Sequence, residues 1–364
     1  MWLVTRYSDV RQVLMDARFQ RSLLSAEDAP ALTGTPNLLD APGGLINMDC
    51  AEHLRLRRVV QRVFTPRGVK RLRPWVEQAI DRLLDELEER GSPADLMAGY
   101  AAAVPNAVMR HLMGVQDLED DRLRRWAEHA VSDTSRSAEE VAAGLRNLME
   151  FSADLLAERR AAPGEDLVST LAQAADQQGG VPKAHLANLV GGLVVAGHDT
   201  TMTMLGNSLL YILGERPEVC QRLASSKEAA GALAERLVHL IPLGRNPEKP
   251  GCLRRAAQDT EIGGVLVRAG EFVAADIGAA NRDPSVFTGS PFDDLFAPLE
   301  SPTLSFGGGT HYCLGIWLAR AQLEIALHRL AARFPGLHLT IAVRETEWRL
   351  STTTRSPLRL PAAW

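Results

Sequence analysis

Cysteine is scarce in this chain of 364 residues, and its four cysteines lie far apart. Their spacing indicates neither a disulfide framework nor a zinc knuckle, so we expect a reduced, cytoplasmic protein. Aromatic residues make up only 5% of the chain, which argues weakly against a pocket built for stacking on a flat aromatic ligand.

An excess of positive charge is also missing, because 40 basic residues face 45 acidic ones and the formal net charge is −5. We therefore expect no nucleic-acid partner. The longest apolar stretch, residues 189–213, is long enough to span a bilayer but carries His198 and Asp199 at its centre. A buried core helix fits it better, and since no signal peptide is visible either, we expect no membrane partner.

What the sequence does contain is typical of a globular protein with a large core: 46% hydrophobic and 23% charged residues. The first two thirds have helical periodicity, interrupted by a long loop over residues 31–48. Residues 261–277 alternate and predict a hairpin that turns at Ala269 and Gly270. Helix returns over residues 314–334. The predicted fold class is mainly α with small β-sheets (α+β).

A glycine-rich turn precedes Cys313 in SFGGGTHYCLGIWLARAQ, at the start of an apolar helix. A thiolate at a helix N-terminus is stabilised by the helix dipole, which lowers its pKa and suits it to bind a metal or attack a substrate. Residues 307–309 and Gly315 let the backbone approach a large planar cofactor. An ordinary buried cysteine is the alternative, while His311 lies too close in sequence to act as the base of a cysteine nucleophile.

This stretch resembles the haem-binding loop of the cytochromes P450 at Phe306, Gly309, His311, Cys313 and Gly315. The resemblance implies that the Cys313 thiolate is the axial ligand of the iron of haem b, where it favours O–O cleavage. It also implies the family fold, a triangular prism of helices around the haem, as a single domain over residues 1–364. The chain opens at the family's first strand, so the usual N-terminal lead-in is expected to be missing.

Residues 196–201 (AGHDTT) are similar to the family's oxygen-binding motif A-G-x-[DE]-T-T. An acid and an alcohol within an apolar helix cost free energy unless they have a role, and together they can deliver protons to a reduced oxygen species. We expect Thr200 to hold a water or the oxygen species and Asp199 to supply protons. The alternative is that Thr200 and Thr201 bond back to helix carbonyls and Asp199 caps a local kink.

The resemblance further implies which residues bind the haem propionates. His53 and Arg57 lie at i and i+4 on one helix face. Arg254 falls where the family has another such arginine, with its neighbour Arg255 as the alternative, and His311 is a fourth contact. A basic helix face is otherwise usually a solvated one.

The chain departs from the family at the Glu-x-x-Arg pattern, in which the two side chains bond to each other and to an arginine in the loop before the cysteine. Aligning Glu235 with the glutamate puts Val238 at the arginine, and residues 291–309 contain no arginine either. Glu235 is then expected to pair with His239 or Arg236. The alternative is a partly solvated Glu235 and a loop held by three apolar side chains, Phe292, Leu295 and Phe296.

The leading hypothesis is a haem-thiolate monooxygenase that inserts one oxygen atom from O₂ into a hydrophobic small molecule, by resemblance a secondary-metabolite intermediate. Because the chain has no flavin or iron–sulfur motif, electrons are expected from NAD(P)H through a ferredoxin reductase and a ferredoxin, docked near Arg57, Arg58 and Arg62. The resemblance places the substrate pocket between residues 31–48, the helices within residues 139–181, the Asp199 helix and residues 352–354.

We expect the protein to be a monomer. Two other functions stay open. One is a catalytically inactive P450-like helper that activates a partner such as a glycosyltransferase. The missing arginines and the short N-terminus favour it, whereas the retained Cys313, Asp199 and Thr200 argue against it. The other keeps the haem but changes the reaction to oxidative coupling or dehydration.

Overall fold

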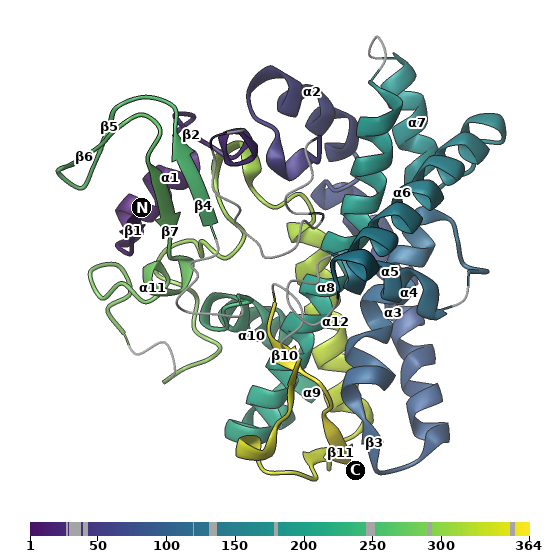
Figure 1. The fold of residues 1–364 in the computed structure, drawn as a ribbon. Coiled ribbons are helices and arrows are strands. Elements are labelled where there is room, and N and C mark those ends of the chain that lie inside the picture. Colours follow the sequence, from purple (N-terminus) through teal and green to yellow (C-terminus); the bar gives the residue numbers. More distant parts are fainter. Residues whose placement is uncertain are drawn as a thin grey trace.

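The computed structural model describes residues 1–26, 28, 38, 43–118, 120–130, 137–177, 181–244, 252–289, 293–349 and 354–364. Helices form most of the molecule, and a small sheet with its own helix lies at one side (Figure 1). The helices are α1 (Tyr7–Met15), α2 (Cys50–Gln61), α3 (Pro66–Arg90), α4 (Ala103–Met113), α5 (Asp120–Ala130), α6 (Ala138–Ala161), α7 (Leu167–Gln177), α8 (Lys183–Glu215), α9 (Cys220–Ser225), α10 (Lys227–Leu240), α11 (Ile277–Ala280) and α12 (Ile316–Arg333). The strands are β1 (Trp2–Val4), β2 (Phe19–Gln20), β3 (Ala94–Asp95), β4 (Cys252–Ala256), β5 (Thr260–Ile262), β6 (Val265–Val267), β7 (Phe272–Ala275), β8 (His338–Leu339), β9 (Trp348–Arg349), β10 (Ser356–Pro357) and β11 (Pro361–Ala363).

Helix α8 is the central element of the fold. Its 33 residues span about 50 Å at the usual rise per residue, and helices α4, α5, α6 and α12 pack around it. Most of its side chains are buried, His198 and Asp199 among them. This confirms the buried core helix predicted over residues 189–213. In the part of the chain that the structure describes, no helix is long and apolar enough to cross a membrane.

The helix ends follow local chemistry in the sequence. Helix α3 begins with Pro66 after Thr65, whose hydroxyl accepts a hydrogen bond from the N–H of Gly68 at 3.1 Å. Helix α6 begins with a capping box between Ser137 and Glu140. Helix α12 matches the predicted helix 314–334 to within two residues at either end.

The sheets are small, as predicted. Among the described residues, β1, β7, β4 and β2 form a sheet in that order, with β1 parallel to β7 and the other pairs antiparallel. Two pairs, β5–β6 and β9–β10, and the three-stranded sheet β3-β11-β8 complete the set. The fold class, mainly α with small sheets, is confirmed.

The predicted hairpin turn at Ala269 and Gly270 is wrong. Strands β5 and β6 pair across Gly263 and Gly264, where φ is +55° and +83°. The turn at residues 268–271 instead redirects the chain into β7, which pairs with β1 and β4 and not with β6. Sequence alternation continues through both turns and therefore does not show which strands pair.

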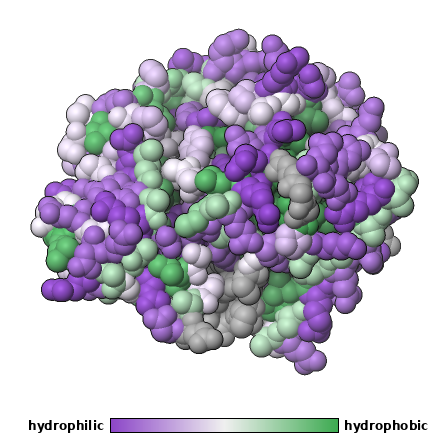
Figure 2. Space-filling view, turned by 90° about the horizontal axis from the view of Figure 1, so that it is seen from above, coloured by the Kyte–Doolittle hydropathy of each residue, from purple (hydrophilic) through white to green (hydrophobic). Residues whose placement is uncertain are grey.

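Several predicted features lie wholly or partly outside the described residues. These are most of the loop 31–48, residues 352 and 353 of the expected pocket wall, and Phe292. The face seen in Figure 2 is mostly hydrophilic, with its hydrophobic residues scattered in small patches.

Candidate functional site

Cys313 lies half-buried at the end of the glycine loop, three residues before α12 begins. Its N–H donates to the carbonyl oxygen of Phe306 at 2.9 Å, which closes the loop into a turn. At Gly309 φ is +61°, and a Cβ there would lie 2.6 Å from the carbonyl oxygen of Leu14. Only glycine fits this position, because the loop rests directly on the backbone of α1.

Burial raises the pKa of the Cys313 thiol, although the N–H of Gly315 and the charges of Arg57 and Arg320 act to lower it. The helix N-terminus alone therefore does not lower the pKa of this thiol as we predicted. The physical reason is that removing the sulfur from water outweighs the nearby positive charges. A metal cation on the sulfur reverses this balance, since a coordinated thiol loses its proton.

His53 and Arg57 lie on one face of α2, as predicted, and both reach the cysteine loop. The ring of His53 packs against that of His311, with centroids 4.4 Å apart and the ring planes tilted by 33°. The Arg57 Nη2 donates to the carbonyl oxygen of Tyr312 at 2.5 Å. His53 is buried and its Nδ1 has no partner among the described residues. Burial, followed by the charges of His311 and Arg57, lowers its pKa to about 4.

Asp49 is a site residue that the sequence analysis did not identify. Its carboxylate lies 2.9 Å from Nε2 of His311 and accepts the main-chain N–H groups of Arg21 and Ser22 at 2.8 and 2.7 Å. Burial acts to raise the pKa of Asp49, but the contacts with His311 and Ser22 outweigh it and lower the pKa to about 2. Asp49 directly precedes α2, and no local feature of the sequence indicates its contact with His311, 262 residues away.

The structure separates Arg254 from Arg255. Arg255 points outward and binds both carboxylate oxygens of Asp28, at 2.7 and 2.5 Å. Arg254 is 4% exposed, and its Nη1 donates to the carbonyl oxygen of Leu253 at 2.9 Å. Within the described ranges it forms no ion pair. Of these two arginines, Arg254 is therefore the buried one, and its charge has no anionic partner among the described residues.

One face of α8 borders open space. A Cβ added at Gly192 would meet no atom within 4 Å, and Ala196 and Thr200, each one turn further along, are exposed although Asp199 is buried. A Cβ at Gly315 would meet nothing within 4 Å either. A flat group that carries an iron and two carboxylates fits these features. The thiol can bind the iron, the open faces leave room for the ring, and the unpaired buried nitrogens can bind the carboxylates.

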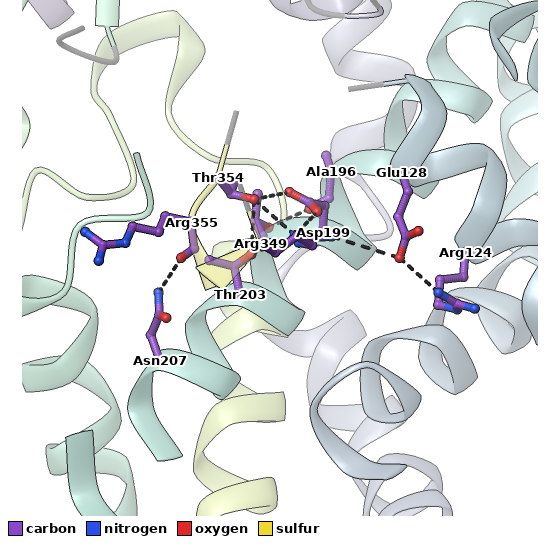
Figure 3. Close-up of polar contacts among 10 residues, drawn as sticks. Arg124, Glu128, Ala196, Asp199, Thr203, Asn207, Arg349, Thr354 and Arg355 are labelled. Atoms are coloured by element: carbon purple, nitrogen blue, oxygen red, sulfur yellow. Dashed lines mark hydrogen bonds and ion pairs between the residues drawn. The ribbon is translucent and has the colours of Figure 1, made fainter. Parts of the chain in front are cut away.

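The Asp199 carboxylate is held by the C-terminal hairpin (Figure 3). Its Oδ1 accepts Nη2 of Arg349 at 2.6 Å, and its Oδ2 accepts the hydroxyl of Thr354 at 2.7 Å. The other arm of Arg349 lies 4.0 Å from Glu128, which pairs with Arg124 at 3.1 Å. A buried ion-pair network therefore joins α8, α5 and the hairpin.

Thr200 donates its hydroxyl to the carbonyl oxygen of Ala196 at 2.6 Å. This is the back-bonding that we had considered as the alternative. The other half of that alternative is wrong: α8 runs without a break through Asp199, which binds Arg349 and caps no kink. Arg349 was not identified from the sequence, because 150 residues separate it from Asp199.

The predicted pairing of Glu235 with His239 or Arg236 is wrong. Glu235 is partly solvated and accepts a two-pronged contact from Arg320 of α12, at 2.7 and 2.6 Å. Arg236 and His239 are buried, and among the described residues neither forms an ion pair with Glu235. Of the packing residues in the alternative, Leu295 is buried and Phe296 packs against the core.

A cleft of about 340 Å³ lies beside the cysteine loop, between α3, α10 and α12. Lys70, Arg73, Arg320 and Trp317 are among its lining residues, and Trp317 is 44% exposed. A second hollow, at the end of α2 and the turn before α3, is lined by Arg58, Gln61, Arg62 and Thr65. Arg57, which we expected on this basic surface, is half-buried and bonded to the cysteine loop.

Comparisons with known proteins agree on one family. The cytochrome P450 family model matches residues 247–339. The chain is 41% identical over 365 residues to nocardicin C N-oxygenase of Nocardia uniformis subsp. tsuyamanensis, covering 100% of this chain and 89% of that protein. It is 39% identical to mycinamicin IV hydroxylase/epoxidase of Micromonospora griseorubida, with the same coverage. The solved structure of HinD with NMFT and NO aligns with a TM-score of 0.91 at 38% identity, covering 100% of this chain and 90% of that one.

The chain therefore belongs to the cytochrome P450 family and is a P450 monooxygenase of the actinobacterial biosynthetic type. The predicted P450 fold is confirmed over the whole chain by the match to HinD.

Gly309→Ala is expected to lower the free energy of unfolding by about 2 to 5 kcal/mol. About 1 to 2 comes from the left-handed backbone and about 1 to 3 from the contact with Leu14. Gly264→Ala is the matched control, because its φ is also positive but a Cβ there meets nothing within 4 Å. Denaturant unfolding measures both variants, and equal losses would show that the loop does not press on α1.

Arg349→Met is expected to destabilise the protein by about 3 to 5 kcal/mol, because it leaves the Asp199 charge buried without its cation. Adding Asp199→Asn should recover at least about 1 kcal/mol of that loss. Arg90→Met, which breaks a solvent-exposed pair with Glu86, should cost about 1 kcal/mol or less. Strictly additive effects of the Asp199 and Arg349 changes in denaturant unfolding would contradict a coupled pair.

Proposed function

We propose that this P450 inserts one oxygen atom from O₂ into a hydrophobic small molecule of a secondary-metabolite pathway. The observation that carries the proposal is the placement of Cys313 beside open space in a loop that three basic side chains surround: the buried His53 and the half-buried Arg57 and His311. The relatives reported above are named as an N-oxygenase and a hydroxylase/epoxidase. Those names favour catalysis over an inactive helper.

The site residues divide into a metal ligand and propionate partners. Cys313 would bind the iron of haem b through its sulfur, and the haem, when bound, supplies the activation of O₂. Arg254 and His53 would take the propionates, since their nitrogens are buried with few or no partners. Arg57 and His311 lie next to them and add positive charge, while Phe306, Gly309 and Gly315 shape the loop.

Asp199 and Thr200 would deliver the protons. Inserting one oxygen atom and releasing the other as water consumes two electrons and two protons, so the buried site needs a proton path. Thr200 faces the open side of α8, and Asp199 is its neighbour on the buried side. Both Asp199 oxygens already accept hydrogen bonds, one from Arg349 and one from Thr354, which fix the position of the carboxylate.

A ferredoxin, reduced by NAD(P)H through its reductase, would supply the electrons at the basic surface beside the cysteine loop. Lys70 and Arg62 are exposed there. Trp317, four residues after Cys313, lies in the first turn of α12 and lines the same cleft as Lys70. A basic surface attracts an acidic partner and speeds its association.

The test of the proposed function is the absorption spectrum of the purified protein reduced under carbon monoxide. We expect the strongly red-shifted Soret band of a thiolate-ligated haem, and we expect Cys313→Ala to lose that band because it removes the sulfur ligand. Cys252→Ala is the control, a half-buried cysteine on β4. A parent spectrum without the red-shifted band, or one that survives Cys313→Ala, would refute the assignment.

The charge reversal Lys70→Glu should slow reduction by a ferredoxin about tenfold at low salt, because it repels an acidic partner. The difference should shrink as salt screens the charges. Arg344→Glu is the matched control, an exposed arginine beyond the far end of α12. Stopped-flow reduction at several salt concentrations provides the measurement, and an equal effect of both variants would place docking elsewhere.

A further inference from the structure

The side of α10 that faces the loop ahead of Cys313 carries a cation and no acid. Arg236 and His239, three residues apart, are 8% and 2% exposed. Glu235 is on the solvent side and bound to Arg320. A buried guanidinium without an acid partner is costly unless other acceptors satisfy it.

Arg236 finds these acceptors in the main chain of the loop. Its Nη2 donates to the carbonyl oxygen of Ala297 at 2.7 Å and to that of Pro298 at 3.3 Å. Within the part of the chain that the structure describes, Arg236 forms no ion pair. Hydrogen bonds from a charged donor are short and about twice as strong as neutral ones. One side chain therefore fixes the start of the loop against α10.

His239 does not share this task. Its ring packs against Phe287 with centroids 4.5 Å apart, and neither ring nitrogen has a partner among the described residues. Burial, followed by the charges of Arg236 and Arg282, lowers its pKa to about 4, so the ring is neutral at pH 7. Arg236 is thus the charged contact between this face of α10 and the loop.

A second set of contacts fixes the other end of the loop. Asn281, which is buried, donates to the hydroxyl of Ser305 at 2.9 Å and to the carbonyl oxygen of His239 at 3.1 Å, and it accepts the N–H of Leu304. The Ser305 hydroxyl donates to the carbonyl oxygen of Val238 at 2.7 Å. Phe306 follows directly and accepts the N–H of Cys313. The loop is therefore tied to the last turns of α10 at both ends, and its far end leads into the cysteine.

We propose that Arg236 is a positioning residue for Cys313, which it orders by holding the loop of residues 293–305 through main-chain carbonyls. A cation on α10 that bonds to the loop carbonyls, and whose charge also helps to lower the pKa of Glu300 in the same loop, needs no arginine there, which accounts for a loop without one. The proposal rests on the proposed haem-thiolate function for its consequence, but the ordering of the loop is a property of the polypeptide alone.

The experiment compares Arg236→Met and Arg236→Lys with Arg222→Met. Arg222 is the control because its guanidinium lies 4.0 Å from the ring of Phe296 in the same loop but from the exposed side. Hydrogen–deuterium exchange, in the haem-bound and the haem-free protein, measures the order of residues 293–313. The red-shifted Soret band under carbon monoxide and the rate of haem transfer to apomyoglobin report on the thiolate ligand.

Arg236→Met should raise exchange in residues 293–313 at least about tenfold, convert at least half of the red-shifted band to the non-thiolate form, and speed haem transfer about tenfold. Arg236→Lys should fall between Met and the parent, since an ammonium replaces only part of the contact. Arg222→Met should match the parent. These values are the fold-changes expected if the two carbonyl contacts order the loop.

Unchanged exchange and an unchanged band in Arg236→Met overturn the proposal, and so does an increase in exchange spread evenly over the whole protein. If Arg236→Met does not fold, Arg236→Lys decides: a local increase in residues 293–313 supports the proposal and none overturns it. A parent without the red-shifted band refutes the proposed function, while the exchange of the haem-free protein still decides the role of Arg236.

Discussion

The cost of burying a guanidinium determines how the parts of this site are held together. Arg349 is compensated by a carboxylate, Asp199, and thereby ties the C-terminal hairpin to the centre of α8. Arg236 is compensated by two main-chain carbonyls and ties the cysteine loop to α10. Arg254 has one carbonyl contact in the described structure and no acid. Its charge is therefore available to pair with an anionic group of the cofactor.

Features that depend on short stretches of sequence could be predicted. The cysteine loop, the polar centre of α8 and the shared face of His53 and Arg57 follow from spacings of ten residues or fewer, and the structure places them as expected. Such spacings work because helical periodicity and glycine turns are local properties of the backbone. The boundaries of α12 were predictable for the same reason.

Partners that are distant in sequence could not be predicted. Asp49 and His311 are 262 residues apart, and Glu235 and Arg320 are 85 apart, so their pairing depends on how helices pack. Glu235 and Arg236 also differ by one position, about 100° around a helix, so an alignment shifted by one residue selects a side chain with different neighbours. We aligned Glu235 with the family's glutamate, whereas Arg236 is the residue that contacts the loop.

The hairpin that carries Arg349 and Thr354 connects two tasks of the proposed function. As the chain is folded, both Asp199 oxygens accept hydrogen bonds from the hairpin, and the Thr200 hydroxyl donates its proton to a carbonyl of its own helix. In the proposed function, Thr200 would have to turn its proton away from that carbonyl to donate it, whereas the carboxylate oxygens keep lone pairs that can accept one. The family resemblance places the same C-terminal segment at the substrate pocket, next to Thr354. In the proposed function, a substrate that contacts this hairpin would change the contacts of Asp199 and so couple substrate binding to proton delivery through the Asp199–Arg349 ion pair.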